Sequence, residues 1–216
     1  MNNLFNYDSN YVRSMTKAVD AFLLGILWLL CSLPIFTSGA ASAAFYYAFN
    51  KSVRQGLGYP TREFFRSFKA NFKQATILWL ILFALALMLC IDLFILTSGA
   101  LEIGMLAPLL MVTSILIFAI LSVWSLCAFP YMARFENPMK NMLKNSIVVA
   151  LANMHWALLL LVLFAGAAVI SFALPLLILF TPAAYMFLAN RVLERVFRKY
   201  MCPEDLKAQQ EAETQG

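Results

Sequence analysis

The stretch CSLPIFTSGAASAAFYYAFNK, residues 31–51, decides how this chain can fold. An apolar run reaches Pro34, passes through the small or hydroxylated residues 37–39, and resumes as an alanine-rich segment that ends in aromatic residues. Proline disfavours a helical conformation at the residue before it, and small hydroxylated residues are typical of turns and helix starts. The pattern predicts a tight hairpin between two apolar helices.

The composition is typical of a membrane protein. Of the 216 residues, 62% are hydrophobic and only 12% are charged, whereas a soluble domain carries about 25% charged residues. Mean hydropathy is +0.78. At about 20 apolar residues per spanning helix, the length allows roughly five to seven spans in a single transmembrane bundle.

Segments without charged residues locate the candidate spans. Four segments carry no charge or a single one: 21–50, 75–101 with Asp92, 103–130 and 146–190. As one helix, residues 146–190 would be about 68 Å long, more than twice the hydrocarbon thickness of about 30 Å, so they predict two helices with a turn between Ala165 and Pro175. Residues 21–50 would span about 45 Å, which is too long for one upright span and short for two.

The distribution of basic residues favours two crossings. All 16 lysines and arginines fall before residue 21, in 51–73, in 131–145 or after residue 190. If residues 21–50 cross twice, all of them lie on one side, as the positive-inside rule favours. The sequence therefore predicts an all-α polytopic transmembrane bundle of six helices with both termini in the cytoplasm. A single crossing, which gives five helices, and a re-entrant pair are the alternatives.

One transmembrane domain is expected over residues 1–200, followed by a polar tail at 201–216 that we expect to be disordered. The predicted helices lie near 18–34, 38–53, 75–98, 104–130, 146–167 and 170–190, with an additional interfacial helix near 61–73. A signal peptide cleaved at Ala41-Ser42-Ala43 is a weaker alternative, because cleavage would leave the six basic residues of 51–73 outside the cell.

The segment TREFFRSFKANFK, residues 61–73, is the most informative polar stretch. On a helix, one narrow stripe contains Arg62, Arg66, Lys69 and Lys73, and the adjoining face contains Phe64, Phe65, Phe68 and Phe72. This pattern is typical of a helix that lies at the headgroups of the bilayer, with rings towards the acyl chains and charges towards anionic lipid phosphates. Packing of the rings on the protein's own helices is the alternative. No nucleic-acid module accompanies the stripe, so nucleic acid is not an expected partner.

Two polar residues within the apolar segments are candidate intramembrane sites. Asp92 is about 9 Å from the predicted outer end of its helix, and His155, the single histidine, falls near the middle of the membrane. Such residues usually mark a transport path. The alternatives are an Asp92 that reaches the outer interface and a His155 that is hydrogen-bonded to a neighbouring helix.

Motifs of catalysis are missing from the sequence. One histidine excludes an H-E-x-x-H zinc site, and no phosphate-binding loop, G-x-S-x-G or dinucleotide fingerprint is present. The four cysteines, which are Cys31, Cys90, Cys127 and Cys202, lack metal-ligand or C-x-x-C spacing and are interpreted as packing residues. We therefore predict no catalytic, cofactor-binding or metal-binding residues and no enzymatic activity.

The chain resembles the YesL-like bacterial membrane proteins, a domain family without an established function. The likeness rests on LWLLCSLPIFTSGAASAAFYYAFNK at 27–51, FFRSFKANFKQATILWLIL at 64–82 and, more weakly, ARFENPMKNMLKNSIVVALAN at 133–153. It implies a bacterial inner-membrane protein whose relatives are often encoded beside carbohydrate uptake genes. It implies no catalytic residues.

Three functions follow from these observations. The first is an accessory or regulatory membrane protein that contacts a sugar-transport permease or its ATPase through segments 51–73 and 131–145. The alternative is a small-solute transporter or channel that uses Asp92 or His155, and an intramembrane enzyme is third. The lipid bilayer and its anionic headgroups are expected partners in each case, and the oligomeric state is left open.

Overall fold

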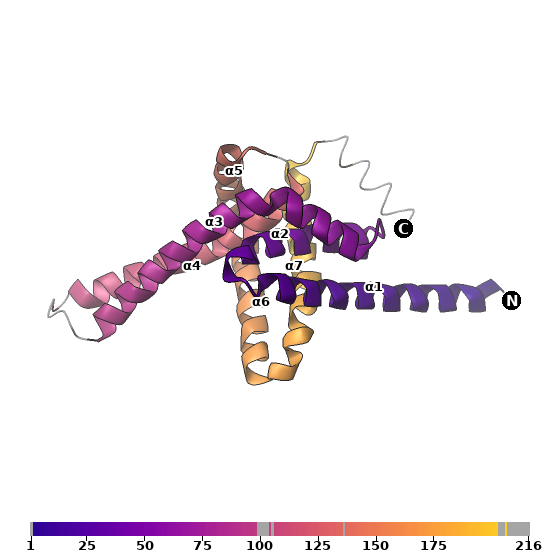
Figure 1. Ribbon diagram of the computed structural model, residues 1–216, viewed down its shortest axis with the longest axis horizontal. Coiled ribbons are helices and arrows are strands. Elements are labelled where there is room, and N and C mark those ends of the chain that lie inside the picture. The colour runs from indigo at the N-terminus through magenta and orange to yellow at the C-terminus, as the bar shows by residue number, and fades with distance from the viewer. Residues whose placement is uncertain (1, 99–103, 105, 136, 203–205, 207–216) are drawn as a thin grey trace.

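The computed structural model describes residues 2–98, 104, 106–135, 137–202 and 206, and these residues form helices and turns without a strand. Among them are seven α-helices (Figure 1): α1 (Asn2–Ser32), α2 (Ser38–Ala48), α3 (Pro60–Thr97), α4 (Leu106–Arg134), α5 (Met139–Ala152), α6 (Met154–Ala173) and α7 (Thr181–Phe197). Shorter helical turns extend or join them: η1 (Ile35–Thr37), η2 (Phe49–Arg54), η3 (Pro175–Leu179) and η4 (Arg198–Tyr200). The predicted all-α class is confirmed for these residues.

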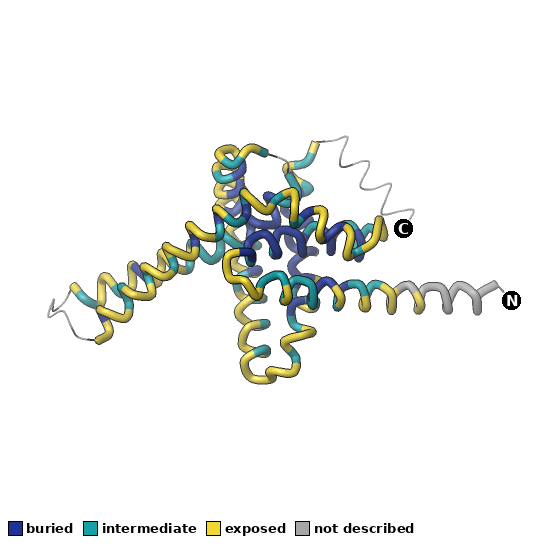
Figure 2. The backbone as a smooth tube through the Cα atoms, viewed as in Figure 1, coloured by how far each residue is buried: buried dark blue, intermediate teal, exposed yellow. Residues whose placement is uncertain are grey.

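Three arms leave a central junction, as Figure 1 shows. The α3–α4 pair and the α6–α7 pair are hairpins that project in different directions, and α1 projects in a third. Buried residues concentrate around α2 where the arms meet, whereas the arms carry mainly exposed residues (Figure 2). Many of the exposed side chains are large and apolar, for example Phe94, Leu109 and Phe172. The core therefore lies at the junction, and the arms present apolar surface of the kind that faces lipid.

Within the part of the chain that the structure describes, four segments are long and apolar enough to cross a membrane: Ser14–Ser32 of α1, Pro60–Thr97, Leu106–Arg134 and Met154–Ala173. The predicted count of six is not confirmed. α2 has 11 residues, about 17 Å of helix, which is much less than the hydrocarbon thickness of about 30 Å. α7 has 17 residues and carries the charges of Arg191, Glu194 and Arg195. Both are short helices that run back from the end of a longer apolar helix.

The chain reverses direction between α1 and α2, as predicted from Pro34. Across the turn, Trp28 Nε1 of α1 donates a hydrogen bond to Ser42 Oγ of α2 (3.1 Å). Within the turn, the Thr37 hydroxyl donates to the carbonyl oxygens of Cys31 (2.5 Å) and Pro34 (2.7 Å). The last carbonyls of a helix have no partner within the helix, so this hydroxyl satisfies groups that the end of α1 leaves open.

α2 is the element around which the other helices pack. All five of its alanines are inaccessible to solvent: Ala40, Ala41, Ala43, Ala44 and Ala48. At Gly39, a Cβ atom would lie 2.7 Å from both the Ala75 carbonyl oxygen and Trp79 Cβ, and 2.8 Å from Phe129 Cε1. These distances are shorter than carbon atoms tolerate, so only glycine lets α3 and α4 approach this closely. Small residues serve the same purpose at helix contacts in membranes generally.

α3 runs without interruption from Pro60 to Thr97, so the predicted interfacial helix near 61–73 is not a separate element. Pro60 stands at the first turn, where its missing N–H costs nothing. No glycine or proline separates the basic segment from the apolar one. The basic segment is therefore the polar extension of a candidate spanning helix.

The two C-terminal hairpin helices also differ from the prediction. The segment predicted as one helix near 146–167 begins earlier, in α5, and is broken at Asn153 before α6 continues to Ala173. The predicted turn between Ala165 and Pro175 lies instead around η3, and the following helix is α7 rather than residues 170–190. Gly166 is accommodated within α6, and the helix ends only at Leu174, the residue that precedes Pro175.

We expect Gly39→Ala to destabilise the protein by about 1–3 kcal/mol, because the added methyl group overpacks the contact with the α3 backbone. The matched control is Gly166→Ala, where a Cβ would meet nothing within 4 Å. Thermal unfolding of the purified protein in detergent measures both. Equal melting temperatures for the two variants would contradict the close approach of α2 and α3.

Candidate functional site

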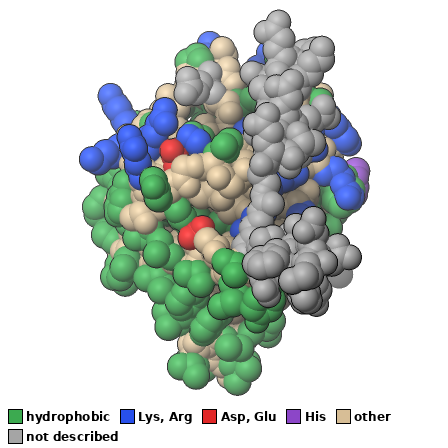
Figure 3. Space-filling model, turned by 90° about the vertical axis from the view of Figure 1, so that its right-hand side faces the viewer, with side chains coloured by type: hydrophobic (Ala, Val, Ile, Leu, Met, Phe, Trp, Pro, Cys, Tyr) green, Lys and Arg blue, Asp and Glu red, His purple; other side chains and the backbone are tan. Residues whose placement is uncertain are grey.

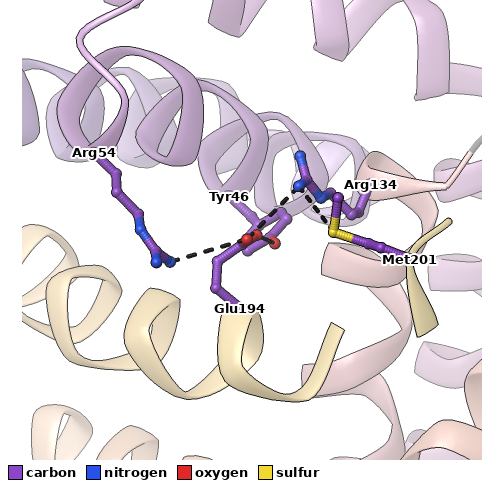
Figure 4. A network of polar contacts seen from close by, with 5 residues as sticks. All are labelled: Tyr46, Arg54, Arg134, Glu194 and Met201. Atoms are coloured by element: carbon purple, nitrogen blue, oxygen red, sulfur yellow. Dashed lines mark hydrogen bonds and ion pairs between the residues drawn. The ribbon is translucent and has the colours of Figure 1, made fainter. Parts of the chain in front are cut away.

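A buried carboxylate lies at the centre of the junction (Figure 4). Glu194 of α7 has no solvent exposure. The Tyr46 hydroxyl of α2 donates a hydrogen bond to Glu194 Oε1. Arg54 Nη1 and Arg134 Nη2 lie 3.9 Å and 3.7 Å from Glu194 Oε2. A buried charge is costly unless it is paired and hydrogen-bonded, and here both conditions are met.

The partners of Glu194 come from separate parts of the chain. Tyr46 lies on the buried helix α2, and its ring packs edge to face against Phe197 with centroids 5.9 Å apart. Arg54 ends the π-helical turn η2, and Arg134 is the last residue of α4. Arg134 Nη2 also lies 3.4 Å from Met201 Sδ, after the end of η4. This Glu194 network therefore ties α2, η2, α4 and α7 together.

The Tyr46 phenol is held in its protonated form. Burial raises the pKa of Tyr46 well above its ordinary value, and the negative charge of Glu194 and the hydrogen bond to it raise the pKa further. A protonated phenol can donate to the carboxylate at any pH near neutrality. The Tyr46 hydroxyl and the two guanidinium groups near Glu194 are all hydrogen-bond donors, so they match an ionised carboxylate and stabilise the contact between the helices.

Sequence reasoning missed Glu194, although a signal was present. Asn190, Leu193, Glu194 and Phe197 follow the spacing of one helical face, and all four are buried. An acidic residue on an otherwise apolar face predicts a buried charge that needs a cationic partner. Its neighbours Arg191 and Arg195 are exposed and fall on other faces.

The basic stripe lies on the polar extension of α3, and its four cations, Arg62, Arg66, Lys69 and Lys73, are all exposed. The four rings do not share one environment. Phe64 is fully buried and Phe68 is half-buried, whereas Phe65 and Phe72 are exposed. Phe64 and Phe68 therefore follow the alternative that the sequence left open, packing on the protein's own helices, and Phe65 and Phe72 remain exposed. Phe64 and Phe68 lie on the face of α3 that packs against the junction, so their rings pack in or against the core.

An ion pair fixes the first turn of α3 against η2. Lys51 Nζ lies 2.9 Å from Glu63 Oε2, and Arg66 Nη1 lies 3.9 Å from the same oxygen. Glu63 is 6% exposed and stands in the first turn of α3, where a negative charge also interacts favourably with the helix dipole. The start of the basic stripe is therefore held in place rather than free to lie along the bilayer.

A cavity of about 370 Å³ opens between α3 and the turn that joins α4 to α5. From α3, it is lined by Arg66, Asn71 and Gln74, and from the other side by Phe135 and Asn137. Segments 51–73 and 131–145, which were predicted as two separate basic surfaces, thus meet around one polar cavity.

The structure does not bring Asp92 and His155 together, because they lie on different hairpins. Asp92 of α3 accepts a hydrogen bond from Ser114 Oγ of α4 and is half-buried. His155 is exposed and is the second residue of α6, so it lies at the start of a candidate span and not near the middle of the membrane as predicted. Its ring centroid lies 5.2 Å from that of Trp156. Asp92 therefore joins the two helices of one hairpin, and His155 lies near the start of another.

Asn153, which precedes His155, has a structural role. It is 4% exposed and its Nδ2 donates to the Val149 carbonyl (3.0 Å) and to the Tyr200 hydroxyl (2.9 Å), while its Oδ1 accepts from Lys199 Nζ (3.2 Å). These bonds attach η4 to the break between α5 and α6. Over the residues that the structure describes, no three His, Cys, Asp or Glu side chains are grouped as metal ligands.

Comparison with known proteins gives one match. The family model described as "Protein of unknown function, DUF624" matches residues 21–93, which include the C-terminal part of α1, all of α2 and most of α3. The resemblance to YesL-like proteins is consistent with this match. No curated protein and no solved structure matches the chain.

We expect Glu194→Ala to destabilise the protein by about 3–5 kcal/mol, because removal of the carboxylate leaves Arg54 and Arg134 close together without their shared anion. Tyr46→Phe removes one donor to a charged acceptor and should cost about 1–3 kcal/mol. The control is Tyr59→Phe, whose side chain is 76% exposed. Thermal unfolding in detergent measures the melting temperatures of the three variants, and Glu194→Ala should have the lowest. An unchanged melting temperature for Glu194→Ala would exclude a structural role for the Glu194 network.

Proposed function

We propose that this protein is a non-enzymatic accessory or regulatory membrane protein that docks a partner protein on its basic end. The observation that carries this proposal is the cavity between α3 and the α4–α5 turn, with the exposed basic stripe beside it. The bilayer and the partner then contact different parts of the molecule. The apolar arms face lipid and the basic end faces the partner.

The lining of the cavity suits a protein loop. Asn71, Gln74 and Asn137 carry amide groups that can both donate to and accept from a backbone. Phe135 and Tyr47 add aromatic rings of the kind that is enriched in protein interfaces. Arg66 at the rim and the exposed cations on the same stripe would steer an acidic partner towards the cavity.

The basic surface is preorganised, which supports a docking role. Phe64 and Ser67 of α3 are buried in the junction, and the Lys51–Glu63 ion pair holds the first turn. A surface that is already ordered loses less conformational entropy on binding. A flexible basic segment would bind anionic lipid equally well but would gain less from a shaped partner.

The charge distribution supports a cytoplasmic location for this end. Figure 3 shows lysine and arginine side chains gathered at one end of the visible face and hydrophobic side chains at the other. The positive-inside rule then favours the cytoplasmic side for the basic end, with both termini cytoplasmic. We further propose, from the resemblance to YesL-like proteins, that the membrane is a bacterial inner membrane and that the partner is the permease or ATPase of a carbohydrate-uptake system.

The geometry favours docking over transport. Asp92 is hydrogen-bonded to Ser114 within its own hairpin, and His155 is exposed at the start of another. Neither residue lines the cavity beside the basic stripe. Docking is therefore supported by a cavity beside the basic stripe, whereas the contacts of Asp92 and His155 are those of a helix pair and of an exposed helix start.

The test is co-purification after co-expression with the permease and ATPase of a carbohydrate-uptake system. Replacing all four stripe cations (Arg62, Arg66, Lys69 and Lys73) with glutamate should reduce recovery of the complex at least tenfold. The reason is that like charges would then face an acidic partner across the interface.

The matched control exchanges the same residues without changing charge, as Arg62→Lys, Arg66→Lys, Lys69→Arg and Lys73→Arg, and should retain the complex. Labelling of Cys202 with a membrane-impermeant thiol reagent, with the other three cysteines replaced by serine, checks that topology is unchanged. Full recovery of the complex with the glutamate variant, in unchanged topology, would exclude the basic stripe as the docking surface.

A further inference from the structure

A second cavity, of about 310 Å³, lies between α1, η2 and α7. Three cations from these three elements line it: Lys17, Arg54 and Arg191. Phe49 and Phe187 form an aromatic wall, and the Arg191 guanidinium lies 4.6 Å from the centre of the Phe187 ring. No acidic side chain is among the described residues that line this cavity. Like charges repel, so three of them around one space are an unfavourable arrangement unless an anion is bound between them.

The lining also includes a polar group without a partner. Asn190 of α7 is 1% exposed, and its Nδ2 atom makes no hydrogen bond with any residue that the structure describes. Burying such a donor without an acceptor costs free energy. The Nδ2 atom has almost no accessible surface, so a ligand in the cavity would contact the cationic side chains of the lining and not this nitrogen.

The Glu194 network does not neutralise this cavity. The Glu194 carboxylate is close to Arg54 Nη1 (3.9 Å), and it also pairs with Arg134 (3.7 Å) on its other side. Lys17 and Arg191 add two positive charges at the cavity that lie outside the Glu194 network.

We propose that this cavity binds the phosphate group of an anionic ligand, and that the ligand is an anionic phospholipid. Phosphate oxygens only accept hydrogen bonds, which matches the three cationic donors that line the cavity. The aromatic wall provides apolar contact for the glycerol and acyl part of a lipid. Lys17 lies near the start of the candidate span Ser14–Ser32, and a basic pocket between membrane helices at the cytoplasmic surface is a known type of lipid headgroup site. This site is independent of the docking surface on α3.

The experiment measures lipid binding to the full-length protein by native mass spectrometry from detergent, with phosphatidylglycerol and phosphatidylcholine as probes. We expect phosphatidylglycerol to bind preferentially. The double variant Lys17→Gln/Arg191→Gln should weaken its binding about thirty-fold, the factor expected for the loss of two basic side chains near an anionic lipid. Both side chains reach solvent, so the variant is expected to fold, and circular dichroism checks this.

The matched control is Lys140→Gln/Lys144→Gln, which removes the same charge from exposed positions on α5. It should bind phosphatidylglycerol as the unchanged protein does. Equal affinity of the cavity double variant and the α5 control would overturn the proposal.

Inorganic phosphate distinguishes the source of the phosphate group. Competition by millimolar phosphate that requires Lys17 and Arg191 would support the site and show that the headgroup phosphate is the recognised group. If phosphate alone stabilises the protein as much as phosphatidylglycerol does, the ligand is a soluble phosphate compound and the lipid assignment fails.

Discussion

A carboxylate with no access to water has to be compensated within the protein, and the junction is organised around the compensation of Glu194. Two guanidinium groups and one phenol supply it. Because the three groups come from α2, η2 and α4, the pairing of one charge on α7 fixes four elements relative to one another. Removal of any one partner leaves a buried or half-buried charge, which is why the network holds the arms together more firmly than surface ion pairs would.

The close packing around α2 makes this pairing possible. Gly39 allows the backbones of α2 and α3 to approach, and the alanines of α2 and Tyr46 have no solvent exposure. In a membrane, apolar side chains gain little by leaving lipid for protein, so helix contacts depend on close packing and on polar bonds. This protein combines the two at a single junction and leaves the arms to lipid.

The sequence predicted the features that depend on local chemistry. Charge-free segments gave the all-α class, and the residues around Pro34 gave the hairpin between α1 and α2. It could not show that Phe64 and Phe68 pack inward, because helical periodicity gives the face of a residue and not what covers that face. The turn near Pro175 was placed too early because the small residues that follow Ala165, among them Gly166, were included in the predicted turn. A membrane helix tolerates such a glycine within its length.

The polar sites depended on tertiary contacts that no spacing in the sequence encodes. Glu194 and Tyr46 are 148 positions apart, and Lys17 and Arg191 line one cavity because α1, η2 and α7 pack against one another. Arg54 belongs to both arrangements, since it lines the cavity and lies 3.9 Å from Glu194. An anion in the cavity and the Glu194 carboxylate would therefore share one guanidinium group. Their interactions with it would be linked, so a ligand that binds there would also change how firmly α7 is held at the junction.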